Sequence, residues 1–349
     1  MKHISFFIIL DGFRTSYITK DKMPFVSSLG KMNTIEPIPS FCQRPTIFSG
    51  NSPIKTGCFV DFVYNGGNAK WYKKYLKRYN SYNIPKKYQG YFDIEENYKK
   101  FKDKNSPLFK ELKKNGYKII WVNNFEFDFK KLKPKTVFFI HYTGSEPIAF
   151  KYGIHSKQIK AYLKRVDGSI KRIFKTAEQN GEITSLIMSD HGMTTIKENV
   201  DIMHMLNSLN SKFGSDYIVF LNSPMARFWF LNKKAEKEIL IFLGGLKKYG
   251  KILSDNDFIK FKIPKEKKYG DVIFYMKNGI NISPDFYHPK KIKSMHGYLD
   301  EKPPILITYS TSNMLKIKKR CNLIDIMPTF LELLKINNKT KTDGRSVLK

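Results

Sequence analysis

Two short apolar runs dominate the pattern of hydrophobic and polar positions along the chain. Residues 4–10 read ISFFIIL and residues 183–188 read ITSLIM, and an aspartate follows each run closely, as Asp11 and Asp190. An unbroken apolar run of this length is typical of a strand that is buried on both faces of a parallel sheet. We therefore expect both aspartates at the carboxyl ends of central strands.

The rest of the pattern alternates strands with helices. Further apolar runs predict strands at residues 117–122, 136–141 and 304–309, and two more within 217–231. Apolar positions at helical spacing predict helices at residues 23–32, 43–49, 106–115, 154–179, 200–209, 234–246 and 322–334. This alternation indicates a doubly wound, mostly parallel α/β sheet with helices on both faces.

We assign residues 1–349 to one α/β domain that carries two insertions. The chain is longer than the roughly 250–300 residues at which a single core stops growing. Residues 61–105 lack clean periodicity, and residues 216–295 alternate short β-like runs with one helix. We interpret both segments as insertions that form a smaller α+β cap over the site.

The residues at the strand ends suggest a metal site. Open α/β sheets bind their ligands at the carboxyl ends of the strands. Asp190 is followed by His191, and a carboxylate beside an imidazole suits a divalent cation such as Zn²⁺. A solvated strand-end turn would explain this pair equally well, but the second acidic strand end at Asp11 favours the metal site.

A segment with three prolines, residues 37–50 (PIPSFCQRPTIFSG), offers three candidate nucleophiles. Ser40, Cys42 and Thr46 lie at or near the start of the predicted helix 43–49, where backbone amides favour an oxyanion or a phosphate. A hydroxyl held beside a metal can lose its proton and act as a nucleophile. The alternative for Ser40 is a plain helix N-cap.

The chain is strongly basic, with 62 Lys and Arg against 31 acidic residues and a net charge of +31. Such an excess can indicate a nucleic-acid or anionic-membrane partner. The lysines are spread along the whole chain, and no zinc-finger spacing or RNA-binding aromatic motif accompanies them, so we expect nucleic acid only as a substrate. A basic surface also concentrates small anionic substrates such as phosphate esters.

The cysteines and the apolar runs bear on the compartment. Cys42, Cys58 and Cys321 are odd in number and form no CxxC motif, which favours free thiols in a reducing compartment. The apolar start of the chain is broken by Asp11 and is short for a signal peptide. No run approaches the roughly 18 apolar residues of a membrane span, so we expect a cytoplasmic protein. The sequence carries no signal of oligomeric state.

Several motifs follow one another in the order seen in the alkaline-phosphatase superfamily. They are ILDGF at residues 9–13, SDHGM at 189–193, MHGY at 295–298, DIMPTFL at 325–331 and DGRS at 343–346. The chain most resembles the nucleotide pyrophosphatase/phosphodiesterase branch, over nearly its whole length outside the two insertions. The resemblance implies two divalent metals, usually zinc with manganese or magnesium as alternatives, and hydrolysis of phosphate esters through a covalent phospho-enzyme.

The resemblance also implies roles for individual residues. The first metal would be held by Asp11, Asp190 and His191. Counting back from the pair Ser49-Gly50 places Ser40 at the nucleophile position of the family. Cys42 and Thr46 stay open as rivals, because a thiolate is a good metal ligand and nucleophile and Thr46 lies in the same short helix.

The expected second metal site departs from the family pattern Asp-x-x-Gly-His-x-x-Gly. The matching segment reads EPIAFKYG, so Glu146 keeps a carboxylate but Phe150 stands where the family has a metal-binding histidine. His296 of the MHGY motif supplies the remaining ligand, and His141 and His155 are candidate substitutes. Weakened metal binding, including loss of activity, is therefore one expectation.

The function that the resemblance implies is a metal-dependent phosphodiesterase or nucleotide pyrophosphatase acting on a small anionic phosphate ester. Alternatives on the same fold are a phosphomonoesterase, a phosphotransferase or a sulfatase-type hydrolase, because a fold does not fix a substrate. Arg44 falls where related sulfatases carry a site arginine, and its guanidinium could hold phosphate oxygens; a surface salt bridge is the alternative. Phe150 favours one further alternative, a metal-binding pseudoenzyme.

Overall fold

The computed structural model describes residues 3–67, 84–288, 290–312, 317 and 320–349. Within them, seven strands form the central sheet, and their order across it is β17 (Cys321–Asn322), β2 (Asn33–Glu36), β16 (Ile305–Ser310), β7 (Glu182–Met188), β1 (His3–Leu10), β6 (Thr136–Tyr142) and β5 (Lys118–Asn123). Strand β1 pairs in parallel with β6 and β7, and β5 pairs in parallel with β6. Strand β16 runs antiparallel to both of its neighbours. The predicted mostly parallel sheet is confirmed.

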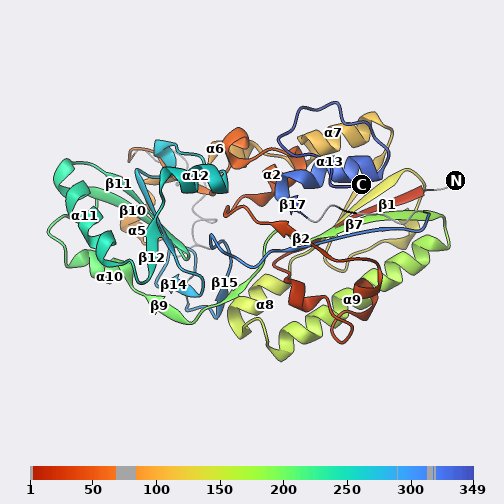
Figure 1. Cartoon of the computed structure of the whole chain (residues 1–349), viewed down its shortest axis with the longest axis horizontal. Coiled ribbons are helices and arrows are strands. Elements are labelled where there is room, and N and C mark those ends of the chain that lie inside the picture. Colours follow the sequence, from red (N-terminus) through yellow and green to blue (C-terminus); the bar gives the residue numbers. More distant parts are fainter. Residues whose placement is uncertain (1–2, 68–83, 289, 313–316, 318–319) are drawn as a thin grey trace.

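Helices cover both faces of this sheet (Figure 1). One face carries α1 (Pro24–Ser28), α8 (Ser145–Tyr152) and α9 (Lys157–Glu178). The other face carries α2 (Gln43–Ser49), α7 (Pro107–Lys114) and α13 (Ile326–Leu333). The prediction of helices on both faces is therefore confirmed.

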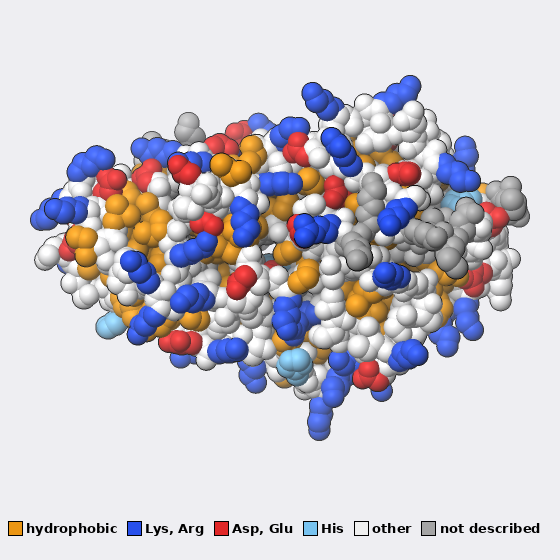
Figure 2. Space-filling view, in the orientation of Figure 1, with side chains coloured by type: hydrophobic (Ala, Val, Ile, Leu, Met, Phe, Trp, Pro, Cys, Tyr) orange, Lys and Arg blue, Asp and Glu red, His pale blue; other side chains and the backbone are white. Residues whose placement is uncertain are grey.

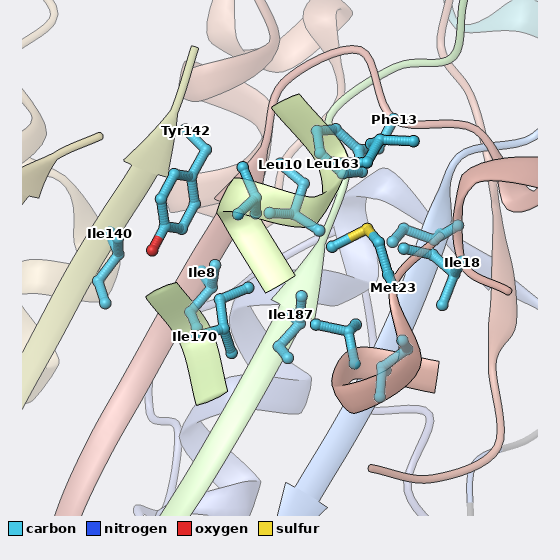
Figure 3. Packing of buried hydrophobic residues seen from close by; sticks show 14 of the residues in the cluster. Ile8, Leu10, Phe13, Ile18, Met23, Ile140, Tyr142, Leu163, Ile170 and Ile187 are labelled. Atoms are coloured by element: carbon cyan, nitrogen blue, oxygen red, sulfur yellow. The ribbon is translucent and has the colours of Figure 1, made fainter. Parts of the chain in front are cut away.

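The alternation of side chains along β1 explains why both faces are apolar. Ile8 and Leu10 belong to the core under α9, whereas Phe7 and Ile9 belong to the core on the opposite face. Successive residues of a strand point to opposite faces, so an unbroken apolar run serves both layers. Figure 3 shows the first of these cores, with strand side chains packed against helix residues such as Leu163.

A smaller lobe lies at the end of the molecule opposite the two termini (Figure 1). Its antiparallel sheet has the order β10 (Tyr217–Asn222), β11 (Met225–Phe230), β13 (Val272–Met276) and β12 (Gly250–Ile252). Phe62 and Phe92, from the first predicted insertion, share one apolar core with Phe220 and Trp229 of that sheet. The described parts of both insertions thus form one α+β unit; residues 68–83 of the first lie outside the described residues.

The remaining elements are short or belong to this lobe. The helices are α3 (Pro53–Thr56), α5 (Lys86–Gln89), α6 (Glu96–Lys100), α10 (Ile202–Asn207), α11 (Lys233–Gly245) and α12 (Asp255–Phe261). The strands are β3 (Phe62–Tyr64), β4 (Phe92–Ile94), β8 (Thr194–Thr195), β9 (Glu198–Val200), β14 (Ile280–Ile282) and β15 (Ser294–Met295). Single 3₁₀ turns occur at Thr15–Tyr17, Asp103–Asn105, Phe129–Lys131, Lys267–Tyr269 and Leu323–Asp325.

Two expectations about local structure were wrong. The helix predicted at residues 23–32 ends at Ser28. Residues 33–36 form strand β2, which pairs with β16, so the chain must leave the helix before them. No helix was predicted between residues 142 and 153, yet Glu146 lies in the first turn of α8. Pro147 fits that turn, since the first amides of a helix have no partner within the helix.

The surface shows no gathering of basic side chains on the visible face. Figure 2 shows Lys and Arg scattered there, with acidic and apolar side chains between them. This matches the even spread of lysine along the sequence. Within the described residues, no helix has the length and apolar character needed to cross a membrane.

Candidate active site

A cavity of about 490 Å³ brings the predicted site residues together at the carboxyl ends of β1, β6 and β7. Its lining includes all of them except Thr46, namely Asp11, Ser40, Cys42, Arg44, Glu146, Asp190, His191 and His296. Residues of the smaller lobe, among them Tyr287 and His288, line the same cavity. The site is therefore built from both parts of the chain.

Hydrogen bonds between the two strand-end loops fix the acidic residues. The Gly12 amide donates to Asp190 Oδ1 at 3.3 Å, and the Phe13 amide donates to Ser189 Oγ at 2.9 Å. Gly12 has a φ of +66°, and a Cβ there would lie 3.3 Å from the Cε of Met193. Glycine is the residue that adopts this turn without strain, so the motif ILDGF holds Asp11 beside Asp190.

Asp11, His141 and Asp190 form one group whose potential ligand atoms lie within 4.8 Å of one another. His141 Nε2 is 3.6 Å from Asp11 Oδ2. Asp11 Oδ1 and His141 Nε2 are buried without a hydrogen bond to the described residues. Buried polar atoms are normally satisfied, so this group is suited to a bound cation.

Glu146, His191 and His296 form a second group within the same distance limit. The rings of His191 and His296 stack with their centroids 3.8 Å apart, and His296 Nε2 is 2.9 Å from Glu146 Oε1. The resemblance had placed His191 with Asp11 and Asp190 instead. His191 Nε2 lies 3.3 Å from Asp11 Oδ1, so the two groups adjoin and His191 stands between them.

The hydrogen bonding of His191 prepares it to bind a cation. His191 Nδ1 lies 2.9 Å from the Gly192 carbonyl oxygen, which can only accept, so Nδ1 donates. In the neutral ring, Nε2 then keeps its lone pair and points toward Asp11 Oδ1. The Nε2 lone pair and the carboxylate oxygens repel one another unless a positive charge lies between them. The donor set therefore fits a divalent ion.

The pKa values of the site follow from burial and close charges. Burial alone would raise the pKa of Asp11, but His141 and His191 hold it below its usual range. Burial raises the pKa of Asp190 against the opposing charge of His191. Burial alone would lower the pKa of His191, yet Asp190 and Asp11 hold it well above its usual value. The pocket thus favours positive charge, as a proton or as a metal ion.

Phe150 lies where the family pattern has an imidazole. Its ring lines the cavity and is nearly parallel to that of His296, with centroids 6.4 Å apart. A phenyl ring offers no ligand atom, so the second group depends on His191 in addition to Glu146 and His296. His155, one of the proposed substitutes, is exposed and lines a different cavity.

The three candidate nucleophiles differ in environment. Ser40 lines the cavity, and its Oγ donates to the Phe59 carbonyl at 2.8 Å and accepts from the Cys42 amide at 3.1 Å. Burial raises the pKa of the Cys42 thiol well above its usual value, which keeps it protonated. Thr46 is fully buried inside α2 and does not line the cavity. Ser40 is the best placed of the three.

Arg44 lines the cavity and also makes the salt bridge that was its alternative role. Its Nη1 is 3.3 Å from Asp103 Oδ2, and its guanidinium lies 5.2 Å from the centroid of Trp121. Its Nη2 is 3.0 Å from His141 Nδ1. Arginine only donates, so Nδ1 accepts and a neutral His141 carries its proton on Nε2. Metal binding through His141 Nε2 would require Arg44 to release Nδ1.

The cavity is also lined by residues that the sequence analysis did not select, among them Gln43, Asp61, Tyr287 and His288. Burial raises the pKa of Asp61, and the Tyr287 hydroxyl donates to its carboxylate. For these residues the sequence contains one cue, the acid Asp285 three residues before His288, because a carboxylate at that spacing can orient an imidazole ring. The pair lies in the second insertion, however, and spacing along the chain does not predict which part of the molecule the insertion contacts.

Solved structures of other proteins resemble this chain in fold. Murine ectonucleotide pyrophosphatase/phosphodiesterase 5 superposes with a TM-score of 0.71 at 14% identity over 100% of each chain. An inactive form of it in complex with AMP gives 0.70 at 14%, and the human protein of the same name 0.70 at 13%, again over 100% of each chain. At this identity the likeness shows the fold alone.

Comparison with protein families by sequence identifies the family of the chain. No curated protein matches the chain by sequence. Residues 67–299, more than half of the chain, match the family described as type I phosphodiesterase / nucleotide pyrophosphatase. Members of this family depend on divalent metal ions, and the two groups of potential ligands agree with that requirement. The chain therefore belongs to the type I phosphodiesterase / nucleotide pyrophosphatase family and is a hydrolase of phosphoric diesters.

Proposed function

We propose that the protein hydrolyses a small nucleotide-like phosphodiester or pyrophosphate through a covalent intermediate on Ser40. The observation that carries this proposal is that Asp11, Asp190 and His191 adjoin in the cavity that Ser40 also lines, with His191 Nε2 3.3 Å from Asp11 Oδ1 and 3.8 Å from Asp190 Oδ1. The murine relative was solved with AMP, which supports a nucleotide as the substrate class. The basic surface would concentrate such an anion near the site.

We propose zinc as the ion, held in one site by Asp11 and Asp190 and in the other by Glu146 and His296, with His191 between the two. Borderline nitrogen donors combined with carboxylates suit zinc better than magnesium. A bound divalent ion would lower the pKa of a nearby hydroxyl and neutralise charge on the phosphate oxygens.

The protein's own residues supply the remaining steps. Ser40 turns its hydroxyl away from the Phe59 carbonyl and loses the hydroxyl proton to solvent. The resulting alkoxide attacks phosphorus as the bond to the leaving oxygen breaks, and that oxygen takes up a proton. Water then loses a proton as it attacks the phosphoseryl group, and the Ser40 oxygen leaves as the alkoxide. Arg44, whose side chain is 41% exposed and paired with Asp103, can turn its guanidinium toward the non-bridging oxygens.

Turnover by metal-stripped protein tests this function. Bis(p-nitrophenyl) phosphate and p-nitrophenyl phosphate are compared after Zn²⁺, Mn²⁺ or Mg²⁺ is added back, with bound metal measured by mass spectrometry. We expect no diester turnover without metal, recovery with Zn²⁺, and at least roughly tenfold faster turnover of the diester than of the monoester. Full metal binding without turnover of either ester would instead support the pseudoenzyme.

A further inference from the structure

His288 enters the cavity from the smaller lobe with a fixed ring orientation. Its Nδ1 lies 2.8 Å from Asp285 Oδ2, and a carboxylate only accepts, so Nδ1 carries the proton. Asp285 is 3% exposed and also accepts the amides of Tyr287 at 2.9 Å and of His288 at 2.6 Å. The two ring nitrogens lie on different edges of the imidazole, so Nε2 is directed away from Asp285.

A buried serine completes the support of this pair. Ser223 lies in the turn between β10 and β11 with a φ of +29° and is fully buried. Its hydroxyl donates to Asp285 and lies 3.2 Å from His288 Nδ1. Because Ser223 is on the Nδ1 side, it is not activated by Nε2, and the three residues are not a Ser-His-Asp nucleophilic triad. They hold the imidazole and can stabilise its positive charge.

His288 stands next to the position where the family's imidazole is missing. Its ring meets Phe150 edge-on, with centroids 5.0 Å apart and an interplanar angle of 81°. Phe150 in turn lies parallel to His296. His288 lines the same cavity as Ser40 and Glu146. The site has thus lost one nitrogen ligand at Phe150 and has another imidazole beside it.

We propose that His288, oriented by Asp285, is the general acid that protonates the leaving-group oxygen. The proposal rests on the proposed function. As the Ser40 oxygen, which has already lost its proton to solvent, bonds to phosphorus and the bond from phosphorus to the leaving oxygen breaks, the imidazolium transfers its Nε2 proton to that oxygen. In the second step neutral Nε2 takes a proton from the attacking water, which restores the imidazolium. Asp285 is a positioning residue.

The physical reason for such an acid is the altered ligand set. A site that lacks one imidazole would hold its ion less firmly, so the ion would be a less dependable source of stabilisation for the negative charge that develops on the leaving oxygen. Proton transfer neutralises the same charge and typically contributes 10²–10⁴-fold to the rate. A leaving group that is already a stable anion gains little from it, and this difference makes the role measurable.

The test compares two esters of one nucleotide, the p-nitrophenyl and the ethyl ester of AMP, with full-length protein. In His288→Gln we expect kcat for the ethyl ester to fall at least about 10²-fold, but kcat for the p-nitrophenyl ester to fall less than about fivefold. Asp285→Asn should show the same pattern in weaker form. His204→Gln, an exposed histidine of α10, is the matched control and should change neither rate.

Other outcomes overturn the proposal in distinguishable ways. Equal loss for both esters, or loss of bound metal in His288→Gln, would mean a structural role or a ligand role instead. Unchanged rates for both esters would exclude any part in catalysis. If the unmodified protein with metal hydrolyses neither ester, the proposed function itself fails and this inference fails with it.

Discussion

Replacing Asp190 by Asn is expected to lower kcat for diester hydrolysis by at least about 10³-fold, because the change removes both a negative charge and a ligand oxygen from the metal group. The Asp190 carboxylate already accepts hydrogen bonds from the amides of Gly12 and His191. An asparagine amide oxygen can keep both bonds, so the loops should retain their shape. The measurement is steady-state turnover together with bound metal per chain.

The matched control for this variant is Asp255→Asn. Asp255 is an exposed carboxylate on α12 that pairs with Lys265 in the smaller lobe. Surface pairs of this kind contribute little, so activity and bound metal should stay at the level of the unmodified protein. Full metal binding and full activity in Asp190→Asn would contradict the metal assignment.

The second large effect is expected for Ser40→Ala, which should reduce turnover by at least about 10³-fold while bound metal is retained. Ser40 is 1% exposed as a residue, yet its side chain lines the cavity, and alanine leaves that packing almost unchanged. The loss therefore reports the missing oxygen nucleophile. Turnover and metal content are measured on the same preparation.

Cys42→Ala and Thr46→Ala are the controls, and both should keep activity within about tenfold. The Cys42 thiol stays protonated because burial raises its pKa, and Thr46 is packed inside α2 away from the cavity. A loss in Cys42→Ala as large as that in Ser40→Ala, at unchanged stability, would transfer the nucleophile role to Cys42.

The sequence pattern predicted the elements that depend on local physics. The runs before Asp11 and Asp190 are strands β1 and β7 because unbroken apolar residues can only be buried between two helical layers. The short helix at residues 43–49 was predicted at its observed bounds. Parallel pairing of β1 with β7 then necessarily brings both carboxylates to one edge of the sheet.

The grouping of histidines could not be predicted, because it depends on strand register and ring orientation. His141 stands opposite Ile9 of β1, which carries its imidazole to Asp11. The bond from His191 Nδ1 to the Gly192 carbonyl turns Nε2 between the two groups. Spacing along the chain reveals neither the register at His141 nor the ring orientation of His191. A motif therefore assigns a histidine to the site but not to a particular ion.

The contribution of the smaller lobe was also hidden from the sequence. His288 lies in the cavity and is held by Asp285, which the turn at Ser223 supports from a distant part of the insertion. Contacts between residues so far apart follow from tertiary packing, which overrides local propensity. Helix α8 shows the same limit, since no helix was predicted there from the sequence.

The most direct test of the central claim is to trap the covalent intermediate. Metal-loaded protein is mixed with the p-nitrophenyl ester of AMP, quenched in acid during turnover and digested for peptide mass spectrometry. We expect an AMP adduct on Ser40, present with metal and absent both from metal-free protein and from Ser40→Ala. An adduct on Cys42 or Thr46 instead, or rapid turnover with no adduct on any residue at any quench time, would contradict the account.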